Sequence, residues 1–297
     1  MSKNFAIIGA AGFVAPRHMS AINETGNRLV AAMDPFDSVG VIDRYAPDAS
    51  FFTEFERFDR HCEKLKRQGE SERIHYVSIT SPNYLHDAHC RFAMRIGADA
   101  ICEKPLVLTP WNVDALREIE EETGQRVYNV LQLRLHPSVI RLREKIQNGP
   151  KDAHYNINLK YITSRGKWYF ISWKGDFDKS GGVATNIGVH FFDMLIWIFG
   201  AVKESEVTLN KADKMTGRLE LERASVNWHL SVDRNDLPIE ATGKRTWRSL
   251  TLDGEEFEFS DGFTDLHNAV YRDILSGGGF GLEEARAAID LVHRLRG

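Results

Sequence analysis

The first thirty-four residues constrain the fold more than any other part of the chain. A short apolar run at 5–8 passes directly into the small-residue segment 9–15, GAAGFVA. An apolar run that closes on glycine is typical of a buried parallel strand entering a tight turn. Residues 16–25 then predict a helix, and residues 29–33 predict a second buried strand. The chain therefore opens with a strand, a helix and a parallel strand.

The turn between the first strand and the helix can hold an anion. Its small residues follow a G-x-x-G-x-x-A spacing, and the backbone N–H groups at a helix start favour a pyrophosphate. Asp34 ends the second strand, where a carboxylate can accept the hydroxyls of an adenosine ribose. We therefore expect a dinucleotide site that includes Gly9, Ala11, Gly12, Phe13, Val14 and Asp34. Two alternatives are an ordinary turn without a ligand and a secretory signal peptide, which the interrupting glycines disfavour.

Composition indicates a globular protein that acts on small molecules. The 297 residues are enough for two domains, and 42% hydrophobic with 27% charged residues is ordinary for a globular chain. A net charge of −4 gives no basic field for nucleic acid or an anionic membrane. Three cysteines without CxxC spacing favour a reducing cytoplasm and no zinc cluster. The most apolar window, residues 194–199, is too short to span a bilayer.

Further strands and helices alternate up to residue 131. Strands are predicted at 76–80, 98–102 and 126–131, and helices at 58–68 and 111–123. With the opening unit and a further helix that carries residues 86–90, this makes five strands and four intervening helical segments. That pattern predicts an α/β domain, doubly wound around a parallel sheet, over residues 1–131.

Polar residues follow two of these strands. Ser81-Pro82-Asn83 comes after the third strand and Glu103-Lys104-Pro105 after the fourth. Open α/β sheets bind ligands at this carboxyl edge, so both segments are candidates. His86 and His89, three residues apart, could bind a metal, but no acid or cysteine completes a site and residues of a helix start are the preferred interpretation. We therefore expect no metal.

The periodicity changes after residue 131. Several strands follow one another and end in a hairpin at Asp253-Gly254, while helices are predicted at 137–148, 187–199, 265–275 and 282–295. Residues 132–297 are thus expected to form an α+β domain with a mostly antiparallel open sheet and helices on one face. An exposed sheet face favours a homodimer or homotetramer. The strands expected in this second domain are 155–161, 204–210, 218–222, 224–232, 246–252 and 255–259.

These motifs resemble those of one oxidoreductase family along essentially the whole chain. The glycine turn, Ser81-Pro82-Asn83 with His86, Glu103-Lys104-Pro105, and Gly188-Val189-His190 with Asp193 are similar to the glucose-fructose oxidoreductase, inositol dehydrogenase and rhizopine-catabolism family, Gfo/Idh/MocA. Within it the chain looks most like the UDP-N-acetylglucosaminuronate (UDP-GlcNAcA) 3-dehydrogenases of lipopolysaccharide O-antigen biosynthesis. The segments 15–18, 84–87, 132–136 and 184–190 carry this narrower likeness.

The resemblance implies a Rossmann domain that binds NAD and an oxidation of the sugar C3 hydroxyl to a ketone. The family often has an aspartate four residues before the histidine, and this chain has Asn186, which cannot take a proton. The catalytic candidates are then Lys104 and His190, with His190 as proton acceptor because an unperturbed histidine pKa near 6.5 suits a base. The implied cofactor residues are Gly9, Ala11, Gly12, Phe13, Val14, Asp34, Ser81, Asn83, His86, Glu103, Lys104 and Gln132.

The implied substrate is a UDP-sugar uronate, an anion with a pyrophosphate and a carboxylate. Basic and aromatic residues alternate over 165–174 and could neutralise those charges or pack on the uracil. The same pattern is equally typical of an exposed strand and loop whose cations are solvated and bind no substrate. The substrate candidates are Lys104, Arg165, Lys167, Trp168, Tyr169, Asn186 and His190, with Lys174 and Trp173 in the same segment. Rival functions are a dehydrogenase of free sugars or inositol, and a non-catalytic NAD(H)-binding regulator.

Overall fold

The computed structural model describes residues 2–241, 243–257 and 265–297. The chain forms two compact units, each built from two stretches of sequence. The first combines Met1–Gln132 with Asp265–Ala285, and the second combines Leu133–Thr264 with Arg286–Gly297. The sequence suggested a single division between residues 131 and 132, and the structure instead assigns 265–285 to the first unit.

A parallel sheet forms the centre of the first unit, with the strand order β3-β2-β1-β4-β5-β6. The order reverses between β1 and β4, so the carboxyl ends of these two neighbours flank the crevice where open α/β sheets bind ligands. The short β3, which begins at Ser50, was not predicted. Its three residues are too few to show a period, and it pairs with β2. The strands are β1 (Asn4–Ile8), β2 (Arg28–Met33), β3 (Ser50–Phe52), β4 (Tyr76–Ile79), β5 (Asp99–Cys102) and β6 (Val127–Asn129).

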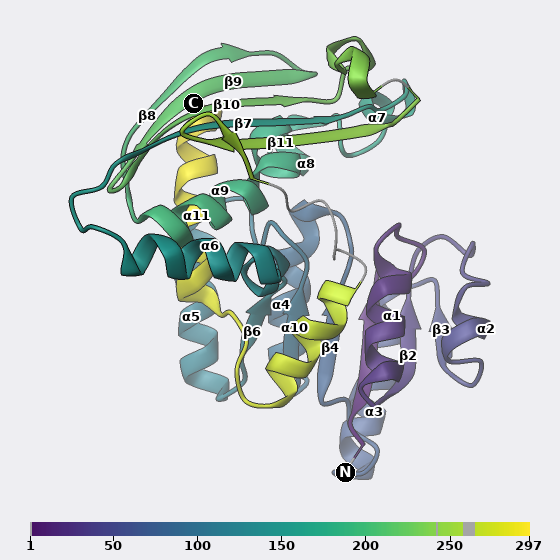
Figure 1. The fold of residues 1–297 in the computed structure, drawn as a ribbon. Helices are drawn as coiled ribbons and strands as arrows, with labels where there is room; N and C mark the ends of the chain where they lie inside the picture. Colours follow the sequence, from purple (N-terminus) through teal and green to yellow (C-terminus); the bar gives the residue numbers. More distant parts are fainter. Residues whose placement is uncertain (1, 242, 258–264) are drawn as a thin grey trace. The chain divides into compact units, whose positions relative to one another are not determined.

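Helices cover both faces of this sheet (Figure 1). One of them comes from the far end of the chain: α10 lies beside α1, and its Tyr271 is fully buried. The Tyr271 hydroxyl lies 2.6 Å from Ser78 Oγ on β4, and its ring stacks on Phe5 of β1. These contacts are why 265–285 belongs to the first unit. The helices are α1 (Ala15–Glu24), α2 (Ile42–Tyr45), α3 (Phe55–Gln68), α4 (His86–Arg95), α5 (Pro110–Thr123) and α10 (Leu266–Leu275).

The second unit is a mixed sheet with helices on one face (Figure 1). The strand order is β12-β11-β7-β10-β9-β8, in which β7 and β10 are parallel and the other neighbours antiparallel. The fold class predicted for both halves is confirmed. The strands are β7 (Tyr155–Thr163), β8 (Val202–Asn210), β9 (Lys214–Leu221), β10 (Ala224–Ser231), β11 (Thr246–Leu252) and β12 (Glu255–Glu256). Of the strand predicted at 255–259, residues 258–259 lie outside the described residues.

The apolar core of the second unit lies between this sheet and its helices. Phe191, Phe192 and Phe199 of α9 are buried there with Trp228 and Leu230 of β10. The helical run 177–199 is long and apolar enough to cross a membrane by length and composition, yet 72% of its most apolar window is buried. A buried core helix passes the same test, so this is weak evidence for a span. The helices are α6 (Pro137–Asn148), α7 (Trp168–Ile171), α8 (Phe177–Ser180), α9 (Val189–Phe199) and α11 (Leu282–Arg296).

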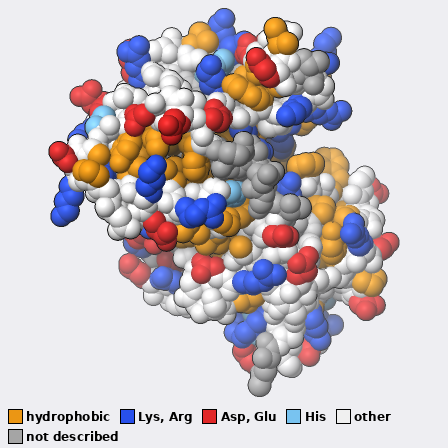
Figure 2. Space-filling view, in the orientation of Figure 1, with side chains coloured by type: hydrophobic (Ala, Val, Ile, Leu, Met, Phe, Trp, Pro, Cys, Tyr) orange, Lys and Arg blue, Asp and Glu red, His pale blue; other side chains and the backbone are white. Residues whose placement is uncertain are grey.

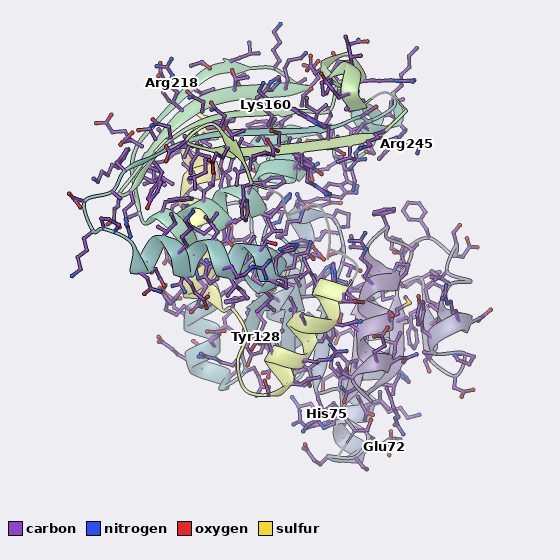
Figure 3. The ribbon with its side chains drawn as sticks, in the orientation of Figure 1. Glu72, His75, Tyr128, Lys160, Arg218 and Arg245 are labelled. Carbon is purple, nitrogen blue, oxygen red and sulfur yellow. The ribbon has the colours of Figure 1, made fainter. Side chains whose placement is uncertain are left out.

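The other face of this sheet is polar. Alternate residues on adjacent strands point outward, so Asn158, Asn227, Arg218 and Glu206 form a cross-strand row. Lys160 and Arg218 mark this face in Figure 3. Acidic and basic side chains are interspersed over the visible surface (Figure 2), in keeping with the small net charge.

Candidate functional site

The glycine turn lies at the reversal point of the parallel sheet. Gly9 has a φ of +92°, and a Cβ there would lie 2.6 Å from the backbone of Thr80 and Ser81. Only glycine fits between the ends of β1 and β4. Gly12 N–H donates to Gly9 O at 2.9 Å, which closes the turn, and α1 begins at Ala15. The turn therefore leaves room for the close backbone approach that a pyrophosphate requires.

Asp34 ties the end of β2 to this turn. Its carboxylate is buried, one oxygen accepts the Ala11 N–H at 2.9 Å, and the other accepts the Phe36 N–H at 2.9 Å. Each oxygen keeps a further lone pair for a ribose hydroxyl. Ala11 thus holds Asp34 in place. Phe13, two residues after Ala11 in the same turn, is 88% exposed.

The polar segment after β4 is fixed by two histidines of α4. Ser81 Oγ lies 2.8 Å from His89 Nδ1, and burial lowers the pKa of His89 to about 4. His86 is fully buried, with Nδ1 2.7 Å from Pro105 O and Nε2 2.9 Å from Ser81 O. Because both ring nitrogens face protein carbonyls, His86 joins the segment after β4 to the segment after β5.

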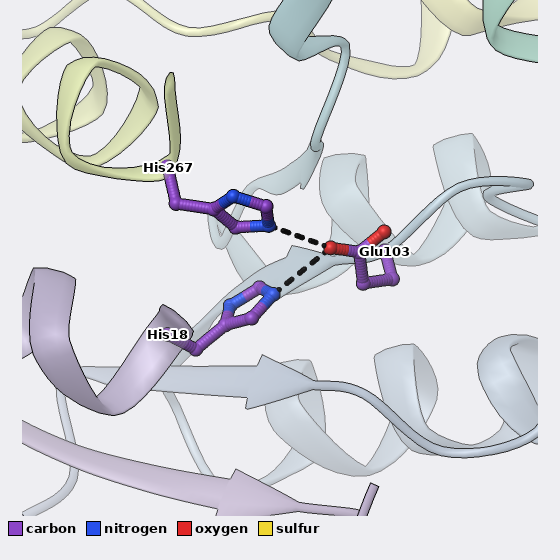
Figure 4. A group of neighbouring side chains, drawn as sticks. All are labelled: His18, Glu103 and His267. Atoms are coloured by element: carbon purple, nitrogen blue, oxygen red, sulfur yellow. Dashed lines mark hydrogen bonds and ion pairs between the residues drawn. The ribbon is translucent and has the colours of Figure 1, made fainter. Parts of the chain in front are cut away.

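Glu103, the residue before Lys104, is the centre of a buried cluster (Figure 4). Its Oε1 accepts hydrogen bonds from His18 Nε2 at 3.1 Å and His267 Nε2 at 2.9 Å. His18 Nδ1 lies 2.7 Å from the Tyr271 hydroxyl. Lys104 itself is half-buried, and its N–H donates to Glu103 Oε2 at 3.2 Å. The cluster thus reaches the backbone of the catalytic candidate.

The charge of Glu103 is set by this cluster. Burial would raise the pKa of Glu103, but the hydrogen bonds from His18 and His267 outweigh it and hold the pKa well below its ordinary value. Burial lowers the pKa of His18, against the hydrogen bond to Glu103. Glu103 is therefore an ionised carboxylate that accepts a hydrogen bond from a neutral His18.

In the second unit the candidate residues lie where a π-helical turn, Ala184–Gly188, runs into α9. π-Helical turns are rare in proteins overall, but those that occur are often found at functional sites. A Cβ on Gly188 would lie 2.5 Å from Leu230 of β10, so glycine lets the turn pack closely on the sheet. His190 is half-buried on α9, with its ring 5.9 Å from that of Tyr161. Asn186 Nδ2 donates to the Tyr169 hydroxyl at 2.8 Å.

The basic and aromatic segment forms a loop and a short helix rather than an extended strand. Arg165 and Lys167 are exposed, and Trp168 is 55% exposed. Tyr169 is buried and holds Asn186, so the ring of Tyr169 anchors the segment. The Lys174 ammonium lies 3.7 Å from the centre of the Trp173 ring. Of the substrate candidates predicted within this segment, Arg165, Lys167 and Trp168 are therefore the exposed ones.

A buried ion pair fixes α9 to the segment after residue 132. Arg134 donates two hydrogen bonds to Asp193, at 3.0 and 2.7 Å, and both side chains are buried. Burial raises the pKa of Asp193, against the lowering effect of Arg134. Asp193 is one turn beyond His190, so the pair fixes the part of α9 that carries the histidine.

The sequence interpretation missed the roles of His18, His267, Tyr271 and Arg134. His18 and Arg134 lie within the segments 15–18 and 132–136, which carry the narrower family likeness but imply no role for these two residues. His267 and Tyr271 lie four residues apart on one face of a predicted helix. Their spacing alone is that of an ordinary amphipathic helix, so it gave no signal.

The residues of the first unit fit a dinucleotide. Gly9 provides a backbone cradle that any Cβ would fill, and Asp34 supplies the carboxylate. Gln132 Oε1 is buried and has no hydrogen-bond partner among the described residues. A buried acceptor of that kind requires a donor from a ligand or water. These three observations agree with the cofactor site predicted from the sequence.

Family models match most of the chain. Residues 3–130 match the NAD-binding Rossmann fold of the GFO/IDH/MocA oxidoreductase family, and residues 143–245 match its C-terminal alpha/beta domain. The chain is 24% identical over 139 residues to the D-glucoside 3-dehydrogenase of Escherichia coli (strain K12), which is 47% of this chain and 40% of that protein. The matches span less than two thirds of the length of such curated relatives.

Solved structures match over nearly the full length. The WlbA (WbpB) dehydrogenase from Thermus thermophilus in complex with NAD and α-ketoglutarate is 50% identical, with a TM-score of 0.95 over 99% of this chain and 94% of that one. The same dehydrogenase with NAD and UDP-GlcNAcA is 49% identical, with a TM-score of 0.95 over 99% and 95%. The predicted enzyme class and cofactor are thereby confirmed. The chain belongs to the Gfo/Idh/MocA family of oxidoreductases and carries its NAD-binding Rossmann domain.

Proposed function

We propose that the protein oxidises the C3 hydroxyl of UDP-GlcNAcA to the 3-keto sugar, with NAD as hydride acceptor, in lipopolysaccharide O-antigen biosynthesis. The observation that carries the proposal is 49% identity over 99% of the chain to a dehydrogenase crystallised with NAD and UDP-GlcNAcA. The buried Asp34 and the glycine turn are suited to binding NAD. The exposed cations Arg165 and Lys167 are suited to binding an anionic sugar nucleotide.

The proposed chemistry needs a base and a donor at the reacting hydroxyl. Bound NAD supplies the acceptor for the hydride that leaves C3. His190 takes the hydroxyl proton as the carbonyl forms, and the Lys104 ammonium donates to the same oxygen and stabilises its developing charge. Asn186 orients a neighbouring sugar hydroxyl by hydrogen bonding.

The proposal assigns cofactor and substrate to different parts of the chain. The first unit, which the sequence placed at 1–131, would bind NAD, and the second unit, within 132–297, would bind the sugar nucleotide and form the oligomer. We further propose a cytoplasmic homodimer or homotetramer. Support comes from the polar outer face of the second sheet, where acidic and basic side chains stand on adjacent strands and could pair between copies.

The direct test is to incubate purified protein with UDP-GlcNAcA and NAD and to follow reduced nicotinamide by absorbance. Reduction that requires UDP-GlcNAcA supports the proposal. Reduction with free sugars or inositol instead would establish the first rival function. Tight NAD binding without turnover of any of these sugars would establish the regulator.

α-Ketoglutarate is proposed as the second substrate. The dehydrogenase from Thermus thermophilus was crystallised with it together with NAD. Hydride delivery to its C2 carbonyl, with a proton from His190, would give 2-hydroxyglutarate and restore oxidised cofactor. With NAD at catalytic amounts, formation of 3-keto sugar should continue only when α-ketoglutarate is present. Equal product with and without it, measured by mass spectrometry, would contradict this step.

Cofactor choice should follow from Asp34. A 2′-phosphate would lie against this buried carboxylate, and residues 35–38 bring no lysine or arginine to neutralise it. We expect NAD to bind at least about tenfold more tightly than NADP, which corresponds to about 1.4 kcal/mol. Calorimetric titration of both cofactors measures this. The exposed Asp37→Asn variant is the control and should keep the preference, whereas equal affinities in the wild type would show that Asp34 does not face the ribose.

The exposed cations should determine the affinity for the sugar nucleotide. Removing a charge-assisted hydrogen bond costs roughly 1.5–3 kcal/mol, so Arg165→Ala or Lys167→Ala should raise KM for UDP-GlcNAcA about tenfold or more. Lys174→Ala belongs to the same series. NAD affinity should not change. Lys179→Ala, an exposed lysine paired with Asp176, is the control. Unchanged KM in all three test variants would mean that the segment is a solvated surface.

A further inference from the structure

The backbone that carries Lys104 is held by buried side chains from several elements. Asn129 Nδ2 of β6 donates to the carbonyl oxygen of Glu103 at 3.3 Å and to that of the preceding residue at 3.0 Å. His86 of α4 lies 2.7 Å from Pro105 O. The side chain of Glu103 is the remaining fixed point, since its Oε2 accepts the N–H of Lys104.

We propose that His18 and His267 are positioning residues for Lys104, acting through the Glu103 carboxylate. Both imidazoles donate to Oε1, which fixes the plane of the carboxylate and so the direction of Oε2 (Figure 4). Oε2 in turn orients the peptide N–H of Lys104. This inference rests on the proposed role of Lys104 at the sugar hydroxyl.

One arrangement of protons accounts for every hydrogen bond of the cluster, and it leaves only His267 Nδ1 buried without a partner among the described residues. Ser78 donates to the Tyr271 hydroxyl, Tyr271 donates to His18 Nδ1, and His18 and His267 each donate to Glu103 through Nε2. A metal ion between the same three ligands would require both imidazoles to carry their proton on Nδ1 instead of Nε2, so His18 could no longer accept from the Tyr271 hydroxyl. Hydrogen bonding is therefore the arrangement that the contacts favour, and a metal centre becomes an outcome of the test.

The cluster connects distant parts of the chain to one residue. His18 lies on the helix that starts at the glycine turn, and His267 lies on α10, which follows the second sheet in the sequence. Both histidines are almost fully buried, so neither is placed to contact substrate directly. A displaced reacting group can cost about 10²-fold in rate. The expected effect of losing a histidine is therefore on kcat.

The test compares two replacements of His267. His267→Leu keeps the volume and removes the donor, and kcat should fall about 10- to 100-fold while KM for both substrates stays within about twofold. His267→Gln can place an N–H near the former Nε2 and should keep most of kcat. Without its donor Glu103 protonates at higher pH, so a second loss of kcat, at lower pH than the acidic limb set by His190, should appear in His267→Leu and not in His267→Gln. His18→Leu and His18→Gln should repeat the pattern.

A matched control and a second measurement complete the design. His75→Leu changes a histidine just before the amino end of β4 (Figure 3), whereas Lys104 follows the carboxyl end of β5. This control variant should leave kcat unchanged. The NMR signal of ¹³C-dimethylated Lys104, assigned by its loss in Lys104→Met, should shift in His267→Leu and not in His267→Gln. This signal tests the positioning even if the wild type does not oxidise UDP-GlcNAcA, which would refute the proposed function alone.

Three results would overturn the inference. One is wild-type kcat and an unshifted Lys104 signal in His267→Leu. Another is an equal loss in the leucine and glutamine variants with no change in the pH profile, which would mean a packing role. The third is one equivalent of divalent metal in purified wild type, with activity lost on its removal and restored on its return. That result would make the cluster a metal centre.

Discussion

Replacing Lys104 with methionine or His190 with asparagine should each lower kcat by at least about 10²-fold while NAD still binds. Hydride loss from a secondary alcohol requires the hydroxyl proton to leave as the carbonyl forms, and a general base contributes about 10²–10⁴-fold. Lys104→Met keeps the length of the side chain and removes the charge that stabilises the developing alkoxide. Stopped-flow measurement of cofactor reduction at saturating UDP-GlcNAcA reports the chemical step.

The pH dependence separates the two roles. With an unperturbed histidine pKa near 6.5 and a lysine pKa near 10.4, only His190 is an ordinary base at neutral pH. The wild-type profile should lose kcat as pH falls and His190 becomes protonated. That acidic limb should disappear in His190→Asn. If it persists there, Lys104 is the base, and near wild-type turnover in either variant would make that residue structural.

The carboxyl-edge site of the first unit could be predicted because local signals agree there. Apolar runs locate the buried strands, and glycine, Asp34 and Glu103-Lys104-Pro105 follow them at the edge where ligands bind. Parallel strands bring these segments together, so no long-range information was needed. The structure adds that Asp34 already accepts two backbone N–H groups, which the sequence could not show.

The buried cluster could not be predicted because its members are distant in sequence. His18 and Glu103 are separated by 85 residues, and Glu103 and His267 by 164. A helical pattern identifies the inward face of 265–275 and does not identify the unit on which it packs. The residues of the π-helical turn at Ala184–Gly188 were predicted partly as helix, since one extra residue in a turn leaves little trace in an apolar sequence.

Breaking the ion pair between Arg134 and Asp193 should strongly destabilise the second unit. Removing one partner leaves the other charge buried and uncompensated, which costs about 3–5 kcal/mol. At roughly 2–4 °C per kcal/mol, the Tm of Asp193→Leu or Arg134→Met should fall by roughly 6–20 °C. Calorimetry measures this. Asp87→Asn is the control, because it breaks a doubly bonded arginine pair on a partly exposed helix face, worth about 0.3–0.5 kcal/mol.

The double variant Arg134→Met with Asp193→Leu separates the effect of an unpaired charge from the effect of the pair itself. With both charges gone and the volume kept, most of the lost stability should return, since apolar replacements of a buried pair are often neutral. If the pair also positions His190, one turn away on α9, then kcat should stay reduced in this stable double variant. A double variant that recovers both Tm and kcat would show that the pair contributes nothing to catalysis, and one as unstable as the single variants would show that its hydrogen-bond geometry is required for folding.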